Sequence, residues 1–176
     1  MVTRPKPRTP SFDNFPKTLT ALNNWVLWSY VLKDDKWTKV PKQPSGSFAR
    51  TNDSKTWNSF DAVSDSYHPK IFDGVGIVLA GKPLDNGLYL IGLDFDHCLT
   101  EGVLDDAPHK AVDSLDTYSE ISPSGEGIRL FLLHDKPTKA RKNNIDGKSR
   151  EVYSTGRYLT VTGHTIGQPK EVRHVS

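Results

Sequence analysis

The sequence predicts an α+β fold, in which short strands joined by turns form antiparallel sheets and a few helices pack against them. Three observations support this prediction. Runs rich in β-branched and aromatic residues recur along the chain, clusters of Gly, Pro, Asn, Asp and Ser separate most of them, and only short segments have helical spacing of apolar residues. The 176 residues suffice to bury a hydrophobic core, so we expect one domain with a tail.

The tail is predicted at the start of the chain. Residues 1–16 contain four prolines together with Arg4, Lys6 and Arg8, a composition that cannot fold on its own. We therefore expect a flexible, basic, proline-rich arm over residues 1–16 and a folded domain over residues 17–176. The arm could make electrostatic contact with nucleic acid, but a plain solubilising tail is the simpler explanation.

The first half of the domain begins with a short helix, because apolar residues in the segment 19–26 have helical spacing. It leads into a strand at residues 25–30, a turn at 33–36 and a partner strand at 37–41, which together predict a hairpin. Lys39 and Lys42 then lie on or just after a strand edge, where most lysines simply face solvent. Residues 55–67 are predicted as an amphipathic helix that packs Trp57, Phe60 and Val63 inward.

The second half is predicted to be rich in strands. Apolar residues 74–79 and the strand that begins at Tyr89 are expected to form a hairpin, and a loop at 100–106 precedes a weak helix at 107–115. Strands are predicted at 118–121 and 128–133, on either side of a loop of Ser and Gly. A basic loop follows, and two further strands are predicted at 151–153 and 157–162. The last dozen residues show no pattern.

Residues 89–98 contain the feature with the clearest chemical meaning. The apolar run at 88–93 predicts a strand buried on both faces, and Asp94 and Asp96 follow at its end. Residues i and i+2 of a strand point to the same side, so both carboxylates project together while Phe95 turns toward the core. Two neighbouring carboxylates suit Mg2+ or Mn2+. The alternative is an ordinary turn, because Asp commonly caps the element after a strand.

Charge is distributed unevenly along the chain although the net charge is only +2. Acidic residues dominate from 94 to 120, where Lys110 is the exception, and basic residues dominate from 136 to 150, where Asp146 is the exception. A basic segment near an acidic metal site suits a substrate that carries phosphates. An ordinary solvated loop would have the same composition.

Cysteine content and hydropathy limit the possible settings of the protein. Cys98 is the single cysteine, which excludes an internal disulfide and a cysteine-rich zinc site. No 18-residue apolar run and no signal-peptide pattern are present. We therefore expect a soluble, cytoplasmic protein without a membrane partner.

Three separated motifs carry a resemblance to a known family. They are Leu-Asp-Phe-Asp-His at residues 93–97, Glu-Ile-Ser-Pro-Ser-Gly-Glu-Gly-Ile-Arg-Leu-Phe at 120–131, and Glu-Val-Tyr-Ser-Thr-Gly-Arg-Tyr-Leu-Thr-Val-Thr-Gly at 151–163. In this order and spacing they resemble the primase-polymerase branch of the archaeo-eukaryotic primase superfamily, especially the catalytic domains of phage and plasmid replication proteins. The resemblance extends from about residue 25 to residue 163, and the three motifs together are far more specific than any one alone.

The resemblance implies an RNA-recognition-like antiparallel catalytic sheet packed with a smaller N-terminal α/β module, with the active cleft between them. It implies that Asp94, Asp96 and Glu151 hold two Mg2+ or Mn2+ ions for nucleotidyl transfer from a dNTP or NTP to a primer, or to an initiating nucleotide, on a single-stranded DNA template. It also implies helicase or accessory domains in a longer protein.

The second motif of this family grips the nucleotide phosphates through a Ser/Gly loop and a histidine. Ser122, Ser124, Gly125 and Gly127 match the loop, whereas Arg129 stands where the histidine is expected. A guanidinium can hold a phosphate with two hydrogen bonds but cannot transfer a proton at neutral pH. Either Arg129 keeps nucleotide binding, or the role is lost and the domain binds without catalysing.

Further site residues follow from position and charge. Lys39 and Lys42 are placed where similar proteins carry a lysine near the triphosphate, and Arg157 and Tyr158 follow the acidic residue of the third motif. Tyr158 either contacts the sugar or is one more core aromatic. Template or primer phosphates would contact the basic segment, whose residues are Lys136, Lys139, Arg141, Lys142, Lys148 and Arg150.

Two other functions are compatible with these residues. One is a non-catalytic module that binds nucleotide or nucleic acid within a larger replication protein, which the substitution of the histidine by Arg129 would favour. The other is a metal-dependent nuclease, because carboxylate clusters also support phosphodiester hydrolysis. The Ser/Gly loop argues against a nuclease, because a nuclease has no triphosphate to bind.

Overall fold

The structure, a computed structural model, describes residues 2–145 and 148–176. Met1 of the predicted arm and Asp146 of the basic segment lie outside the described residues. Two sheets form most of the molecule, and the few helices are short, which confirms the predicted α+β class. The helices are η1 (Phe12–Asn14), α1 (Lys17–Thr20), η2 (Ser54–Thr56), α2 (Phe60–Ser66) and α3 (Asp106–Leu115).

The four-stranded sheet has the order β11-β3-β1-β2, and all its neighbours are antiparallel. Its strands are β1 (Trp25–Lys33), β2 (Lys36–Lys42), β3 (Gly74–Ala80) and β11 (Thr155–Val161). The predicted first hairpin is confirmed, since β1 pairs with β2 around Asp34 and Asp35, both with positive φ. Asp tolerates this backbone, and a turn with two such residues matches the twist of the strands it joins.

The six-stranded sheet has the order β12-β8-β4-β10-β9, with β7 also paired to β8. Its strands are β4 (Tyr89–Phe95), β7 (Ser119–Ile121), β8 (Ile128–His134), β9 (Arg141–Ile145), β10 (Lys148–Tyr153) and β12 (Arg173–His174), and a small separate hairpin joins β5 (Leu99–Thr100) to β6 (Val103–Leu104). Strand β4 lies between β8 and β10, which explains its apolar sequence. The pair β12–β8 is parallel, and the other pairs are antiparallel.

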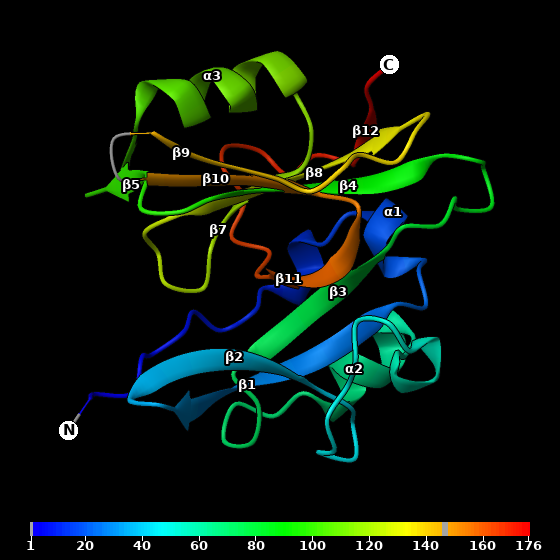
Figure 1. The fold of residues 1–176 in the computed structure, drawn as a ribbon, viewed down its shortest axis with the longest axis vertical. Coiled ribbons are helices and arrows are strands. Elements are labelled where there is room, and N and C mark those ends of the chain that lie inside the picture. Colours follow the sequence, from blue (N-terminus) through cyan, green and yellow to red (C-terminus); the bar gives the residue numbers. More distant parts are fainter. Residues whose placement is uncertain (1, 146–147) are drawn as a thin grey trace.

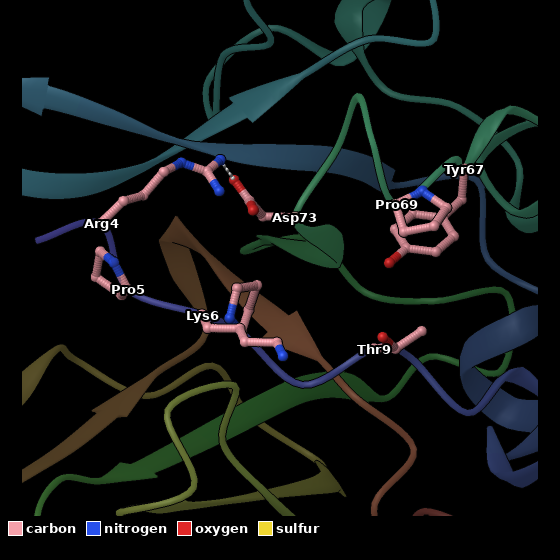
Figure 2. A pocket seen from close by; sticks show the side chains of 8 residues that line it. Arg4, Pro5, Lys6, Thr9, Tyr67, Pro69 and Asp73 are labelled. Atoms are coloured by element: carbon pink, nitrogen blue, oxygen red, sulfur yellow. Dashed lines mark hydrogen bonds and ion pairs between the residues drawn. The ribbon is translucent and has the colours of Figure 1, made fainter.

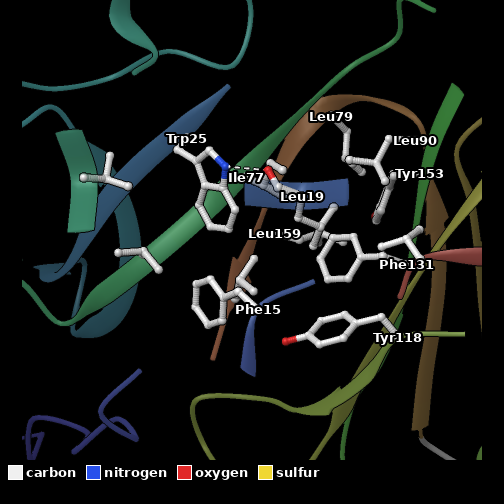
Figure 3. Close-up of a cluster of buried hydrophobic side chains, with 14 of the residues drawn as sticks. Phe15, Leu19, Trp25, Ile77, Leu79, Leu90, Tyr118, Phe131, Tyr153 and Leu159 are labelled. Carbon is white, nitrogen blue, oxygen red and sulfur yellow. Dashed lines mark hydrogen bonds between the residues drawn. The ribbon is translucent and has the colours of Figure 1, made fainter. Parts of the chain in front are cut away.

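The main core lies between the two sheets. Figure 1 shows α3 above the six-stranded sheet and the four-stranded sheet on the opposite side. Figure 3 shows the buried side chains between the sheets, where Ile77 and Leu159 come from one sheet and Leu90 and Phe131 from the other. Stacking of Phe15 on Trp25, with ring centroids 5.6 Å apart, fixes the chain ahead of β1 to this core. A smaller apolar cluster lies beneath α3.

The predicted hairpin of residues 74–79 with the strand at Tyr89 is wrong. Strand β3 pairs with β1 and β11, and β4 pairs with β8 and β10, so the two strands belong to different sheets. The chain crosses between the sheets here, because each strand finds both of its partners in distant parts of the sequence. Consecutive apolar strands indicate burial but do not identify the strands that pair with them.

Several boundaries also differ from the predictions. The helix expected over 55–67 is divided into η2 and α2, because Ser59 accepts a hydrogen bond from the Ala62 backbone N–H and starts a new helix. The loops expected at 100–106 and 136–150 contain the β5–β6 hairpin and the β9–β10 pair. Strand β12 lies in the last dozen residues. The helix predicted at 107–115 is confirmed as α3.

No helix among residues 2–145 and 148–176 is both long enough and apolar enough to cross a membrane.

Candidate active cleft

Asp94 on β4 and Asp96, which directly follows the strand, lie on the same side, as the alternation of the strand predicts. Leu90 and Gly92 share that side: Leu90 is in the core between the sheets, and a Cβ on Gly92 would lie 2.3 Å from Leu159 of β11. Phe95 points the opposite way, into the cluster beneath α3. The carboxylates therefore continue the core-facing side of β4 to the point where the apolar core ends.

A row of charged residues crosses the six-stranded sheet at Asp94. Directly opposed residues of antiparallel strands have their side chains on one face, with Cβ atoms about 4.5–5.5 Å apart. Strand register places Asp94 opposite both Glu151 and Arg129. The complete row, from β9 to β7, is Lys142, Glu151, Asp94, Arg129 and Glu120. The register thus brings residues of all three motifs together.

Arg129 neutralises Asp94 instead of projecting into open solvent. Its side chain is 6% exposed, and Nε lies 3.1 Å from Asp94 Oδ1. The two atoms form an ion pair but not a hydrogen bond. Both are buried and neither has a hydrogen-bond partner. Nη1 of Arg129 donates to the hydroxyl of Thr160 on β11. The guanidinium thereby connects the two sheets beside the carboxylates.

Glu120 at the end of the row is a buried carboxylate with a structural role. It accepts hydrogen bonds from the Tyr118 hydroxyl at 2.7 Å and from the backbone N–H groups of Thr162 and Gly163, each at 2.9 Å to Oε2. Burial raises the pKa of Glu120, although these hydrogen bonds act to lower it. Glu120 joins β7 to the end of β11. The motif spacing gave no sign of this role, because Thr162 lies 42 residues further along.

Glu151 lies next to Asp94 but is engaged by its own neighbours. Its Oε1 is 2.5 Å from Lys142 Nζ and accepts from the Ser149 hydroxyl at 3.0 Å, and its Oε2 accepts from the Tyr153 hydroxyl at 2.5 Å. Burial opposes ionisation, yet these contacts outweigh it and lower the pKa of Glu151. The carboxylate is thus held ionised beside the aspartate pair.

Lys39 faces the aspartates from the other sheet. It is half-buried on β2, and the Tyr158 hydroxyl donates to its carbonyl at 2.8 Å. Burial and the Arg129 charge lower the pKa of Lys39 to about 8, although Asp94 and Asp96 act in the opposite direction. Tyr158 is partly buried against the cluster that contains Val78 of the neighbouring strand, so its hydroxyl positions the lysine backbone.

The space between the sheets here is a cleft of about 780 Å³. Lys39, Asp96 and Ser124 line it from three different elements. The complete lining is Pro5, Lys6, Tyr30, Lys36, Trp37, Thr38, Lys39, Asp96, Ser124 and Glu126. A cleft that places carboxylates opposite cations can bind a metal ion together with an anionic ligand.

The Ser/Gly loop closes on itself at the edge of this cleft. The N–H of Gly125 donates to the Ser122 carbonyl at 3.0 Å, and the N–H of Gly127 donates to the Ser122 hydroxyl at 3.2 Å. The Glu126 N–H donates to Ser124 Oγ at 3.3 Å. These three backbone N–H groups therefore donate within the loop, and the loop contributes Ser124 and Glu126 to the lining of the cleft.

Gly127 fixes the loop against the end of β4, so Gly127→Ala should destabilise the protein. An added Cβ would lie 2.5 Å from the Phe95 carbonyl oxygen and 3.4 Å from Asp96 Cα. We expect a loss of about 1–3 kcal/mol in the free energy of unfolding, as overpacking usually causes. Thermal unfolding checks this, with Glu126→Ala, whose side chain is 62% exposed, as the matched change in the same loop. Equal melting temperatures for the two variants would contradict the close approach.

The aspartate pair has the properties of a cation site. Oδ1 of Asp94 is buried without a hydrogen bond, and burial together with the Asp94 charge raises the pKa of Asp96. A bound cation would satisfy the first group and relieve the repulsion between the two. Within residues 2–145 and 148–176, no group of three or more His, Cys, Asp or Glu side chains is arranged to hold a metal ion. Glu151 is therefore a neighbour of the pair rather than a third ligand in place.

The remaining predicted site residues are distributed over several surfaces. Lys42 lies three positions after Lys39, which puts it on the other face of β2, and its Nζ is 3.8 Å from the Phe48 ring centroid. Arg157 contacts the ring of Tyr153, with its Cζ 5.2 Å from the centroid. His97 of the first motif lies at the surface with 71% of its side chain exposed. These residues do not line the cleft.

The basic segment divides between the two faces of its sheet. Lys142 shares the face of Asp94. Arg150 lies opposite Phe95 on the α3 side, and Lys148 pairs there with Asp105 at 2.5 Å. Alternation along β9 places Arg141 on the α3 side as well, whereas Lys136 and Lys139 lie in the connection between β8 and β9.

Comparison with known proteins gives one informative match. The chain is 28% identical over 164 residues to a protein named DNA Primase-polymerase from Nitratiruptor phage NrS-1. The match covers 90% of this chain and 22% of that protein, so the chain spans about a fifth of the length of its relative. No protein-family model matches the chain. The chain is therefore similar to a phage primase-polymerase over nine-tenths of its length, and this confirms the resemblance that its three motifs indicate.

Proposed function

We propose that this chain is the nucleotidyl-transfer domain of a primase-polymerase. It would add nucleotides to a primer, or to an initiating nucleotide, on a single-stranded DNA template. The observation that carries the proposal is the pair Asp94 and Asp96 at a strand end, where Asp96 and Lys39 of the other sheet line one cleft of about 780 Å³ and both carboxylates act on the charge of Lys39. The similarity to the phage relative supports the same reaction. On this proposal the six-stranded sheet is the RNA-recognition-like catalytic sheet of the primase-polymerase fold.

Asp94 and Asp96 would hold Mg2+ or Mn2+, with two ions expected. Bound there, the metal would make the attacking hydroxyl more acidic and neutralise charge that builds on the triphosphate. Arg129 fixes the direction of the Asp94 carboxylate before any cation binds, since its Nε lies 3.1 Å from Oδ1. Glu151 would join the pair as a metal ligand by giving up its contact with Lys142. The Lys142 side chain is 63% exposed, so it could then contact a phosphate instead.

Lys39 and Ser124 would hold the triphosphate. Lys39 supplies a positive charge from the sheet opposite the aspartates, and Ser124 supplies a hydroxyl from the loop. Tyr158 fixes the backbone of Lys39, so it acts on the nucleotide through that lysine. Ser122, Gly125 and Gly127 shape the loop through its internal hydrogen bonds.

The DNA strands would meet the basic segment near the cleft. Lys142 lies on the cleft face beside Glu151, in a position to contact a template or primer phosphate. Phosphate contacts of this kind weaken steeply as the salt concentration rises. Helicase or accessory domains would act together with this domain in a longer protein, as the relative's greater length suggests.

Primer extension tests the proposal. A labelled primer on a single-stranded template is incubated with Mn2+ or Mg2+ and with dNTPs or NTPs in parallel. We expect incorporation that requires template and divalent metal. Nucleotide binding without incorporation would instead support the alternative function below, and strand degradation without nucleotides would indicate a nuclease.

A non-catalytic binding module is the second candidate. The observation in its favour is Arg129, which occupies the space beside Asp94 with a permanent positive charge and thereby competes with a metal ion. The two functions also differ in how nucleotide binding depends on metal. A binding module would bind a nucleoside triphosphate as tightly in EDTA as in Mg2+, whereas the enzyme would bind it through the metal.

Lys39 should make nucleotide affinity depend on pH. Its pKa of about 8 means that the free protein carries the ammonium below pH 8 and loses it above. Binding of a triphosphate requires that charge, so the dissociation constant should rise by up to about tenfold per unit above pH 8. Calorimetric titration from pH 7 to 9.5 measures it. A Lys39→Met variant should bind more weakly at pH 7 with a flat profile, and an equally steep profile in that variant would exclude Lys39 as the titrating group.

The lowered pKa of Lys39 also makes the stability of the protein depend on pH. Stability should rise with pH, whereas nucleotide affinity should fall. The folded value of about 8 lies below the unfolded value near 10.4, so the folded state binds this proton less tightly than the unfolded chain does. Protonated Lys39 therefore costs folding free energy at neutral pH. This cost disappears as the pH rises from about 8 to about 10.

A further inference from the structure

Several phosphate ligands that the sequence predicts for the nucleotide cleft are already engaged in other contacts. Arg129 is engaged by Asp94 and Thr160, and the backbone N–H groups of Gly125 and Gly127 donate within their own loop. Lys39 is the motif-predicted cation that lines the cleft. A triphosphate carries about four negative charges, so further cations beside Lys39 would strengthen its binding.

The N-terminal segment crosses the cleft and brings cations to it. We call residues 4–11 the strap. At its start, Arg4 Nη2 is 2.6 Å from Oδ2 of buried Asp73, an atom that also accepts from the Tyr30 N–H at 2.7 Å. The Arg4 guanidinium lies 5.9 Å and 5.8 Å from the ring centroids of Tyr30 and Trp37. Figure 2 shows Arg4 pointing at Asp73 while the strap continues toward Thr9.

The end of the strap is anchored to the other half of the molecule. The Arg8 N–H donates to the Pro123 carbonyl at 3.0 Å, and the Ser11 N–H donates to the Thr162 carbonyl at 2.8 Å. His164 Nε2 donates to the Thr9 carbonyl at 2.7 Å. The strap therefore spans from β1 and β2 to the Ser/Gly loop and to the end of β11, as the course of the N-terminal segment in Figure 1 shows. Pro5 and Lys6 of the strap line the cleft.

Two side chains between these anchors are exposed and positively charged. Lys6 lines the cleft together with Lys39 and Asp96. The Arg8 guanidinium lies over the Ser/Gly loop, with Nε and Nη2 both 3.2 Å from the point where a Cβ on Gly125 would be. Residues 2–11 contain no acidic residue. The anchors thus fix the backbone and leave Lys6 at the cleft and Arg8 over the Ser/Gly loop beside it.

From this placement we infer that Lys6 and Arg8 bind the β- and γ-phosphates of the incoming nucleoside triphosphate, and that the strap forms one wall of the nucleotide site. The inference rests on the proposed function. Arg4 is an anchor rather than a ligand, because its guanidinium is committed to Asp73. The absence of a side chain at Gly125 leaves room for the guanidinium of Arg8 against the loop.

Equilibrium binding of dATP with Mg2+ to the full chain tests the inference. The Lys6→Ala/Arg8→Ala double variant should raise the dissociation constant at least tenfold, because two charge-assisted contacts are lost. The control is Lys82→Ala/Lys110→Ala, which removes the same charge from two exposed positions, one of them on α3. The control should bind like the unaltered protein. Deoxyadenosine monophosphate, which lacks the β- and γ-phosphates, should bind all three proteins equally.

A proteolysis experiment supplies a second readout that does not depend on the variants. Trypsin cleaves poorly before proline, so Arg4-Pro5 and Lys6-Pro7 resist it and Arg8-Thr9 is the sensitive bond of the strap. Saturating dATP with Mg2+ should slow cleavage at Arg8-Thr9 at least fivefold, as followed by mass spectrometry. The monophosphate should not slow it.

The outcomes separate the inference from the proposed function. Binding of dATP by the unaltered protein with no difference between strap and control variants would overturn the inference alone. Equal weakening for dATP and the monophosphate would place the strap at the sugar or base and also overturn it. No binding of dATP by the unaltered protein would overturn both the inference and the proposed function.

Discussion

Asp96→Asn should reduce nucleotide incorporation by about a thousandfold or more without lowering the thermal stability of the protein. The loss follows from the proposed role, because a metal ion at such a site contributes several kcal/mol to stabilising the transition state. The stability follows from the pKa of Asp96, which burial and the Asp94 charge raise. Above that pKa the ionised carboxylate costs folding free energy, and the amide removes this cost.

Primer extension and thermal unfolding at pH 7, performed on the same protein samples, check both halves of this prediction. The matched control is Asp113→Asn, which neutralises a carboxylate that is 67% exposed on α3. The control should incorporate nucleotide at the unaltered rate. Normal incorporation by Asp96→Asn would remove Asp96 from the site, and a large drop in melting temperature would show that the carboxylate has a structural partner.

Arg129→Met should destabilise the protein by about 3–5 kcal/mol, which is the usual cost of removing one partner from a buried ion pair. Arg129 is 6% exposed and its partner Asp94 is 14% exposed, so water cannot replace the lost charge. For a chain of this size the melting temperature should fall by about 6–20 °C. The large effect reflects the uncompensated charge that remains on Asp94, rather than the net contribution of the ion pair to the free energy of unfolding.

A second substitution shows whether that explanation is correct. Asp94→Asn added to Arg129→Met removes the unpaired charge and should recover at least half of the lost stability. If Arg129 served only as a phosphate ligand, the single variant would keep its melting temperature and lose nucleotide affinity alone. Thermal unfolding of the two single variants and the double variant distinguishes these roles.

The side on which each residue lies could be predicted from the sequence, because alternation in a strand is a local property. Asp94 and Asp96 lie on one side of β4 and Phe95 on the other, as predicted. The same rule separates Lys39 from Lys42, which are three residues apart, and applying it would have assigned only one of them to the cleft. The Ser/Gly loop between two strands was also predictable, since its residues favour a turn.

The partners of those side chains were decided only by the tertiary structure. Sequence placed Arg129 on the correct strand, but its engagement with Asp94 and Thr160 depends on which strands are neighbours and in which register. For the same reason β3 and β4 belong to different sheets although they are consecutive. Composition alone predicted a flexible arm at residues 1–16, and nothing in that segment indicated its contacts with Asp73 or Pro123.

By itself the sequence therefore determined which residues are candidates for the chemistry: the two aspartates, the glutamate of the third motif and the small-residue loop. The tertiary structure decided which of their charges are already paired and which cations line the cleft. Alternation and turn formation depend on neighbouring residues, whereas strand pairing and the docking of a terminal segment depend on contacts between residues far apart in the chain. Such contacts form only when the hydrophobic burial of the whole domain outweighs the conformational entropy lost in closing long loops.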